Sequence, residues 1–298
     1  MFEIEGIIAA IATPMFENGE INEKEIQNQV NRQIKAGVNA LFCLGTNGEF
    51  YCLTEKEKLK VIELVVKATN RRVPVFAGTG CNSTRETIEL SQKAIELGAD
   101  ALSIITPSFA LLNQDELYQY YADIASKVEV PIVMYNIPAR TGNSLSPKIV
   151  KQLAKDYPNI KGIKDSSGNF NLILQYLQST QGMEFSVLSG NDALILWTLL
   201  AGGKGGITAI ANIFPERMVK IYEYFKSGDL ERAKEMQNSI APIRECLQLG
   251  NPNSIVKKAA QLIGQNVGPC RAPYGMISDE LSQKILEVLK THYSNDLQ

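Results

Sequence analysis

Residues 73–105, VPVFAGTGCNSTRETIELSQKAIELGADALSII, contain the unit that decides the fold. An apolar run at Val73–Ala77 is followed by a short polar loop. Ser83 and Glu86 then form the Ser-x-x-Glu box that caps the start of a helix. A second apolar run, Ala101–Ile105, closes the unit. The order strand, loop, helix, strand predicts a βαβ unit, and such units build parallel sheets.

The same unit recurs along the chain. Eight apolar runs have the length and composition of strands: Ile7–Ala12, Ala40–Leu44, Val73–Ala77, Ala101–Ile105, Ile132–Tyr135, Ile160–Ile163, Phe185–Leu188 and Gly206–Ala209. Gly37, Gly98 and Gly202 stand where helix gives way to strand, as left-handed helix ends require. Eight strands alternating with helices predict an α/β fold, a (β/α)₈ TIM barrel. An open Rossmann-like sheet is the alternative, although the Gly-x-Gly at 78–80 lacks the third glycine of that motif.

The strand pattern stops after about Pro215. Helical patterns follow at Met218–Phe225, Leu230–Leu249, Ser254–Ile263 and Asp279–Leu289. We expect the first of these helices to close the barrel. Residues 1–227 would then form a catalytic barrel, and residues 228–298 a C-terminal helical extension packed on it. No linker rich in proline or serine separates the two parts.

Composition excludes several classes of protein. Of the 298 residues, 45% are hydrophobic and 21% are charged, which is typical of a globular chain. Lys and Arg total 30 and Asp and Glu total 32, a balance that argues against nucleic acid as a partner. No apolar run approaches the ~18 residues of a membrane span, and Met1–Glu5 lacks the basic start of a secretion signal. Five cysteines without a CxxC pair predict reduced thiols in the cytoplasm.

The chain has a single histidine, His292, in a polar stretch near the end. Catalysis by a Ser-His-Asp or Cys-His pair, and metal sites with several histidine ligands, are therefore excluded. The chemistry must depend on Lys, Tyr, Asp, Glu, Thr or Cys.

In a (β/α)₈ barrel the carboxyl ends of the strands line the active-site mouth. Few polar residues stand at the predicted ends: the loop GTNGE at 45–49, Tyr135 with Arg140 after it, Lys164 with Asp165, and Thr208. A lysine, a tyrosine, a threonine and an arginine are therefore expected to face one cavity.

Lys164 is the most informative of these residues. Alternation along the strand places Ile160, Gly162 and Lys164 on one face, and the glycine leaves room inside a barrel. A charged lysine is costly to bury, whereas a neutral amine in an apolar barrel is a nucleophile that forms Schiff bases with carbonyl compounds. The alternative is a lysine at the barrel rim that pairs with Asp165.

The other candidates also have two interpretations. Tyr135 is either the proton shuttle that an imine needs or a core aromatic residue. The Gly45–Gly48 loop is either a nest of N–H groups that holds a carboxylate or a simple turn. Arg140 either binds a second carboxylate as a fork or is a solvated loop residue.

Three motifs together resemble those of the dihydrodipicolinate synthase / N-acetylneuraminate lyase family. They are GTNGE at 45–49, YNIP at 135–138 and GIKD at 162–165. The likeness continues through SGND at 189–192 and GGI at 205–207. It covers the whole barrel in matching order.

This resemblance implies a pyruvate-dependent class I aldolase, a carbon–oxygen or carbon–carbon lyase. Lys164 would form the imine with pyruvate, Tyr135 would relay protons, and Thr46 would orient Tyr135. The substrate-binding positions that the resemblance implies are Thr46, Asn47, Arg140, Gly190 and Ile207. It implies no metal or organic cofactor. It implies a homotetramer built as a dimer of dimers.

Departures from the family pattern concern the second substrate. Asn47 replaces a usual threonine, and Phe109 replaces a tyrosine that reaches into a neighbouring subunit. Arg140 follows the synthase pattern, so we expect condensation of pyruvate with L-aspartate 4-semialdehyde, a step of lysine biosynthesis. One alternative is an aldolase of the 2-keto-3-deoxygluconate or N-acetylneuraminate type that releases pyruvate from a keto-deoxy acid. Another is a barrel that binds a keto acid without turnover.

Overall fold

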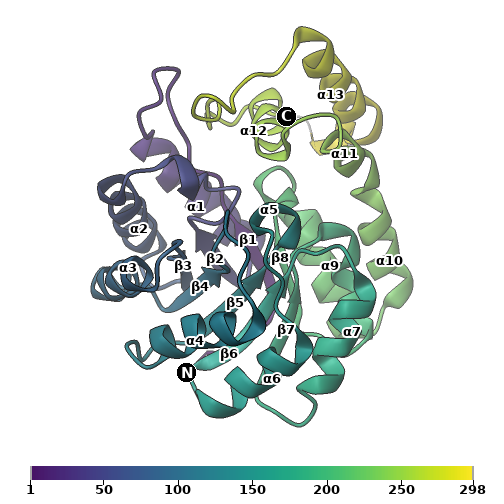
Figure 1. The fold of residues 1–298 in the computed structure, drawn as a ribbon. Helices are drawn as coiled ribbons and strands as arrows, with labels where there is room; N and C mark the ends of the chain where they lie inside the picture. Colours follow the sequence, from purple (N-terminus) through teal and green to yellow (C-terminus); the bar gives the residue numbers. More distant parts are fainter. Residues whose placement is uncertain (1, 297–298) are drawn as a thin grey trace.

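The computed structural model describes residues 2–296 and forms a closed barrel of eight parallel strands in chain order (Figure 1). The strands are β1 (Gly6–Ala10), β2 (Ala40–Cys43), β3 (Val75–Gly78), β4 (Ala101–Ile105), β5 (Ile132–Asn136), β6 (Ile160–Asp165), β7 (Ser186–Ser189) and β8 (Gly205–Thr208). Strand β1 pairs with both β2 and β8, which closes the ring. The predicted TIM barrel is confirmed, and the open sheet is wrong.

Helices follow the strands, and all but the short helix at Pro138–Thr141, which lies at the carboxyl end of the strands, cover the outside of the barrel (Figure 1). They are α1 (Glu23–Ala36), α2 (Glu55–Thr69), α3 (Thr84–Glu96), α4 (Gln114–Ala125), α5 (Pro138–Thr141), α6 (Pro147–Asp156), α7 (Phe170–Ser179), α8 (Ile195–Leu200) and α9 (Pro215–Ser227). Several of these helices begin or end beside the capping residues and glycines that the sequence predicts. The side chain of Ser83 accepts a hydrogen bond from the backbone of Glu86, and Gly37, Gly98 and Gly202 adopt φ of 92°, 97° and 98°.

The hydrophobic core has two layers, one inside the barrel and one outside it. The barrel interior is filled by side chains such as Ile8, Phe42, Phe76 and Leu188. A larger layer lies between the sheet and the helices. Because the interior is packed, a ligand cannot lie in the middle of the barrel, and the strand ends are where a site can form.

Strand β6 contains an irregularity that the sequence pattern did not predict. Ile160 pairs with Ile132, but Gly162 pairs with Val133, so Lys161 is an extra residue. Ile160 therefore packs in the outer layer, and the expectation that it shares a face with Lys164 is wrong. Gly162 is required here, because a Cβ would lie 2.7 Å from the Ser186 carbonyl oxygen.

The C-terminal extension contains α10 (Leu230–Ser239), α11 (Ala241–Cys246), α12 (Pro252–Leu262) and α13 (Asp279–His292). The expected single helix over 230–249 is wrong. Pro242 lies in the first turn of α11, and it has no N–H to continue α10. Helix α10 leads from α9 to α11, α12 and α13, which lie together at one end of the barrel (Figure 1).

The extension shares the outer hydrophobic layer with the barrel: Ile243, Ile255 and Leu289 pack in the same cluster as the barrel helices. The division of the chain at residue 227 remains a prediction. Within residues 2–296, no helix has the length and apolar character that a bilayer crossing requires.

Candidate active site

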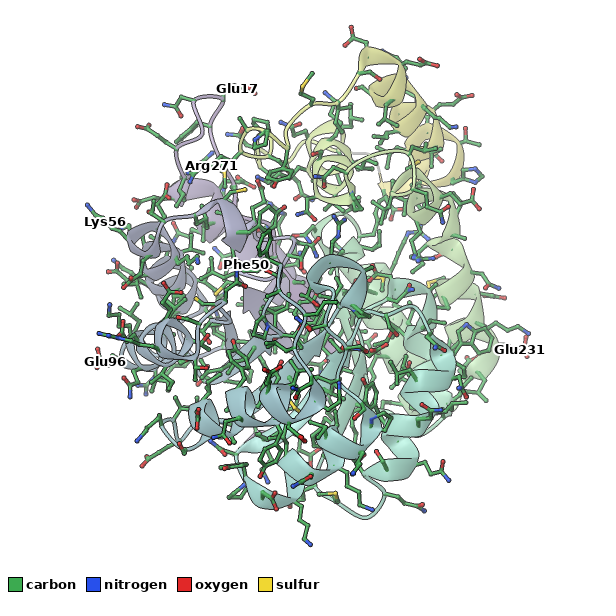
Figure 2. The ribbon with its side chains drawn as sticks, viewed as in Figure 1. Glu17, Phe50, Lys56, Glu96, Glu231 and Arg271 are labelled. Carbon is green, nitrogen blue, oxygen red and sulfur yellow. The ribbon has the colours of Figure 1, made fainter. Side chains whose placement is uncertain are left out.

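A cavity of about 520 Å³ lies at the carboxyl end of the barrel. Its lining comes from strand ends, from the loops and first helical turns that follow them, and from the C-terminal extension: Thr46, Phe50, Tyr51, Lys58, Gly80, Cys81, Asn82, Glu86, Ile105, Thr106, Ser108, Arg140, Thr141, Asn251, Asn253 and Tyr274. Phe50 is labelled in Figure 2, where it lies between the strands and the C-terminal helices. Polar side chains of both charge signs therefore meet in one opening.

The loop after β2 positions Thr46 at this cavity. Its backbone closes two tight turns, from Gly48 N to Gly45 O at 3.0 Å and from Glu49 N to Thr46 O at 3.1 Å. A Cβ at Gly45 would lie 2.6 Å from the Phe42 ring, so only glycine fits. The Thr13 hydroxyl donates to the Gly48 carbonyl at 2.7 Å and joins this loop to the segment that follows β1.

Tyr135 and Lys164 are register partners on the neighbouring strands β5 and β6. Partners in a parallel sheet project from the same face, and both side chains are buried. The Lys164 amine lies 4.0 Å from the centre of the Tyr135 ring, and the Tyr135 hydroxyl lies 3.2 Å from the Thr46 hydroxyl. The structure thus brings together an amine and a phenol from two neighbouring strands and a threonine hydroxyl from the loop after β2.

Two opposing effects act on the pKa of Tyr135. Burial disfavours the phenolate, which would raise the pKa. The positive charge of Lys164 and the nearby side chains of Thr46 and Ser166 favour it. These groups outweigh burial and lower the pKa of Tyr135 below its ordinary value. A phenol in this state gives up and takes back a proton more readily than a solvated tyrosine.

Gly190 and Ile207 lie near the amine. A Cβ at Gly190 would lie 2.8 Å from the Lys164 Cε atom, so the absence of a side chain makes room for the lysine. Ile207, on β8, packs in the barrel interior with Phe42 and Leu188. Both positions therefore belong to the inner wall below the cavity.

Arg140 and Asn47 lie farther out. Arg140, in the short helix α5, is exposed and lines the cavity together with Thr46. Asn47 is half-buried in the β2 loop, and it is not among the cavity-lining residues of the described chain. The structure thus places Arg140 at the cavity entrance, whereas Asn47 follows the lining residue Thr46 without lining the cavity itself.

Asp165 does not pair with Lys164. Its carboxylate accepts hydrogen bonds from the Asn136 amide at 2.7 Å and from the Ser167 hydroxyl at 2.6 Å. Burial raises the pKa of Asp165 despite these bonds. The alternative of a rim lysine paired with Asp165 is wrong, because neighbouring residues of a strand point to opposite faces.

Two site residues were not identified from the sequence. Asn253, on α12, donates its amide to the Thr46 carbonyl at 2.7 Å, and Lys257 on the same helix pairs with Glu49. These contacts join positions about 200 residues apart, and no local motif indicates them. Among residues 2–296, no three His, Cys, Asp or Glu side chains gather as metal ligands do.

A model of the dihydrodipicolinate synthetase family matches residues 3–292. The 4-hydroxy-tetrahydrodipicolinate synthase of Methanopyrus kandleri is 39% identical over 97% of this chain and 96% of that protein. The protein of the same name from Archaeoglobus fulgidus is also 39% identical, over 96% of this chain and 98% of its own length.

Solved structures agree with these relatives. A crystal structure of dihydrodipicolinate synthase superposes with a TM-score of 0.92 at 37% identity, covering 96% of this chain and 98% of that one. A prophage protein of the dihydrodipicolinic acid synthase family from E. coli, solved in complex with pyruvate, gives a TM-score of 0.93 at 33% identity, with the same coverage. The chain therefore belongs to the dihydrodipicolinate synthetase family, a family of class I aldolases and lyases.

Proposed function

We propose that this protein is a 4-hydroxy-tetrahydrodipicolinate synthase, which condenses pyruvate with L-aspartate 4-semialdehyde in lysine biosynthesis. The observation that carries the proposal is the Lys164 amine, buried in the barrel 4.0 Å from the ring of Tyr135. The name of the curated relatives supports the same reaction. The pyruvate bound in the E. coli relative supports the first substrate.

In the first half of the proposed reaction, Lys164 Nζ gives a proton to Tyr135 and, as the neutral amine, attacks the carbonyl carbon of pyruvate. A nitrogen–carbon bond forms, and the carbonyl oxygen leaves as water after taking up protons. Tyr135 moves these protons, with the Thr46 hydroxyl 3.2 Å away as the next member of the relay. The Thr46 hydroxyl and the Asn47 backbone hold the pyruvate carboxylate, and the Ile207 main chain and Gly190 line the same pocket.

In the second half, the protonated imine acts as the electron sink. Loss of a methyl proton gives an enamine, whose carbon attacks the aldehyde carbon of the second substrate. The amino group of that substrate then displaces Lys164 and closes the ring, so the lysine is regenerated. Each step moves only protons and electron pairs within the two substrates and the side chains, and the reaction is balanced without a cofactor.

Arg140 is the proposed selector of the second substrate. Its guanidinium lies at the cavity entrance, where a forked cation suits the carboxylate of aspartate semialdehyde. A sugar chain would instead need groups that bind hydroxyls.

A second candidate is an aldolase that releases pyruvate from a 2-keto-3-deoxy sugar acid. Phe109 favours it, because this fully exposed side chain has no hydroxyl to extend the relay of Thr46 and Tyr135. The amides of Asn82, Asn251 and Asn253 in the cavity lining are also suited to sugar hydroxyls.

The test combines trapping with turnover. Incubation with pyruvate and borohydride should attach one reduced pyruvyl group to Lys164, located by peptide mass, and Lys164→Ala should neither be labelled nor turn over. Assays with aspartate semialdehyde and with keto-deoxy sugar acids then separate the two reactions. Activity on the sugar acids alone would overturn the synthase proposal, and labelling elsewhere would overturn the role of Lys164.

We further propose a homotetramer in the cytoplasm. An apolar surface hollow lined by Phe170, Leu174, Trp197 and Leu200 supports association, because exposed apolar patches commonly mark interfaces. All five cysteines are free, which is consistent with a reducing compartment. Sedimentation equilibrium should give four subunits, and Trp197→Glu should reduce that number.

A further inference from the structure

A buried ion pair joins the β2 loop to the C-terminal extension. Lys257 Nζ lies 2.5 Å from the Glu49 carboxylate, and the two side chains are 2% and 0% exposed. Lys257 also donates to the Pro269 carbonyl at 2.9 Å, and the backbone N–H of Arg271 donates to Glu49 at 2.8 Å. The carboxylate is thus held entirely by residues that follow the barrel in the sequence.

Glu49 has an unusual backbone conformation. Its φ of 54° lies in the left-handed region, which disfavours residues with a Cβ. Such conformations persist where the surroundings over-determine them, and they cluster at functional sites. In this conformation the Glu49 N–H reaches the Thr46 carbonyl at 3.1 Å and closes the turn that carries the Thr46 side chain.

The same helix holds the other end of this turn. Asn253, one helical turn before Lys257 on α12, donates its amide to the Thr46 carbonyl at 2.7 Å. Helix α12 therefore contacts the turn at both ends, at Thr46 and at Glu49. In the turn held this way, the Thr46 hydroxyl lies 3.2 Å from the Tyr135 hydroxyl.

We propose that Glu49, Lys257 and Asn253 are positioning residues, through which α12 sets the Thr46 hydroxyl against Tyr135. This inference rests on the proposed function. It gives the C-terminal extension a part in the chemistry, although none of its residues would react. Without the Lys257 charge, the buried Glu49 carboxylate has lost its counter-ion, and the turn must rearrange to bring it to water. Thr46 then moves away from Tyr135 and from the pyruvate carboxylate.

The test compares two substitutions that each remove one ion pair between the extension and the barrel. Lys257→Met keeps the length and apolar stem of the side chain and removes its charge. Its matched control is Arg217→Met, which removes the pair between Arg217 on α9 and Asp296, a contact that does not touch the β2 loop. Steady-state kinetics, the rate of imine trapping by borohydride and the Tm are measured for both.

For Lys257→Met, the kcat/KM for pyruvate and the trapping rate should fall by about 10- to 100-fold, the effect of a displacement near 1 Å. The KM for the aldehyde should change by less than about threefold, because Arg140 stays in place. Equal losses on both substrates, or none, would overturn the inference. Arg217→Met should keep both kinetic constants.

A second variant covers the case in which Lys257→Met does not fold. Asn253→Ala leaves the ion pair intact and should lower the kcat/KM for pyruvate by about fivefold, through the lost hydrogen bond to Thr46. An unchanged value would overturn the inference. The proposed function fails separately, if the wild-type protein does not trap pyruvate on Lys164.

Discussion

Replacing Gly190 with alanine should disable Lys164 without removing it. Gly190 has no strained backbone angle, so alanine is acceptable to the chain itself. The new methyl group, however, would lie 2.0 Å from the Ser166 hydroxyl and 2.8 Å from the Lys164 Cε atom. The serine can rotate away at small cost, because its hydroxyl makes no well-formed hydrogen bond among the described residues, although its part in lowering the pKa of Tyr135 is then lost. The Lys164 side chain must therefore move to relieve the remaining short contact with the new methyl group.

The size of the effect follows from these distances. Ordinary contact begins near 3.4 Å, so the Lys164 chain must move by about 0.6 Å. Displacements approaching 1 Å reduce catalysis by up to ~100-fold, so we expect kcat/KM for pyruvate to fall by roughly 10- to 100-fold. Inserting a methyl group into a packed site also lowers the free energy of unfolding by roughly 1–3 kcal/mol.

The assay follows pyruvate consumption and borohydride trapping, with thermal unfolding as a measure of integrity. Gly250→Ala is the control, because its methyl group would meet nothing nearer than 3.5 Å. It should behave like the wild type. A Gly190→Ala protein with wild-type kcat and a wild-type trapping rate would refute the idea that this glycine holds space for the amine.

Three further outcomes can be measured on the same protein. Tyr135→Phe keeps the ring against Lys164 but should lower kcat by about 10²–10⁴-fold, with pyruvate binding little changed in calorimetry. Arg140→Ala should raise the KM of the aldehyde far more than that of pyruvate, and equal increases would contradict its role. The Arg271 guanidinium lowers the pKa of Glu57 from 4.5 to about 2, so the stability that this carboxylate provides is present above pH 4.5 and is lost as the pH falls towards 2. After allowance for solvent screening this amounts to about 1 kcal/mol, and Glu57→Gln should show a flatter decline of Tm with acid.

Strand positions could be predicted where apolar side chains decide them. Ala101–Ile105 matches β4 at both ends, because every residue but one in that run is apolar and the neighbours are polar or small. The predicted end of β6 at Ile163 was two residues early. Polar side chains at a catalytic strand end break the hydrophobic pattern, whereas backbone pairing, here Lys164 with Tyr135, continues past them.

The site was predictable in the part that the barrel topology fixes. The rule that strand ends converge was enough to group Lys164, Tyr135 and Thr46, and the structure places them together. The contribution of α12 was not predictable, because it depends on how the extension docks. Asn253 and Lys257 reach Thr46 and Glu49 across more than 200 positions, and helical periodicity does not encode such a contact.

The bulge in β6 has a consequence for the origin and redesign of this chemistry. Ile160 faces the helices, and strict alternation from it would aim position 164 at the helices as well. The single extra residue at position 161 reverses this alternation, so that the Lys164 amine faces inward. Flattening the bulge while keeping all residues, with Ile160 held against the helices, should therefore turn the amine outside, whereas deleting Lys161 together with the bulge should leave Lys164 paired with Tyr135 and facing inward. A designer who straightens this strand must therefore also remove one residue between Ile160 and Lys164, because an ideal strand of unchanged length would aim the lysine away from Tyr135.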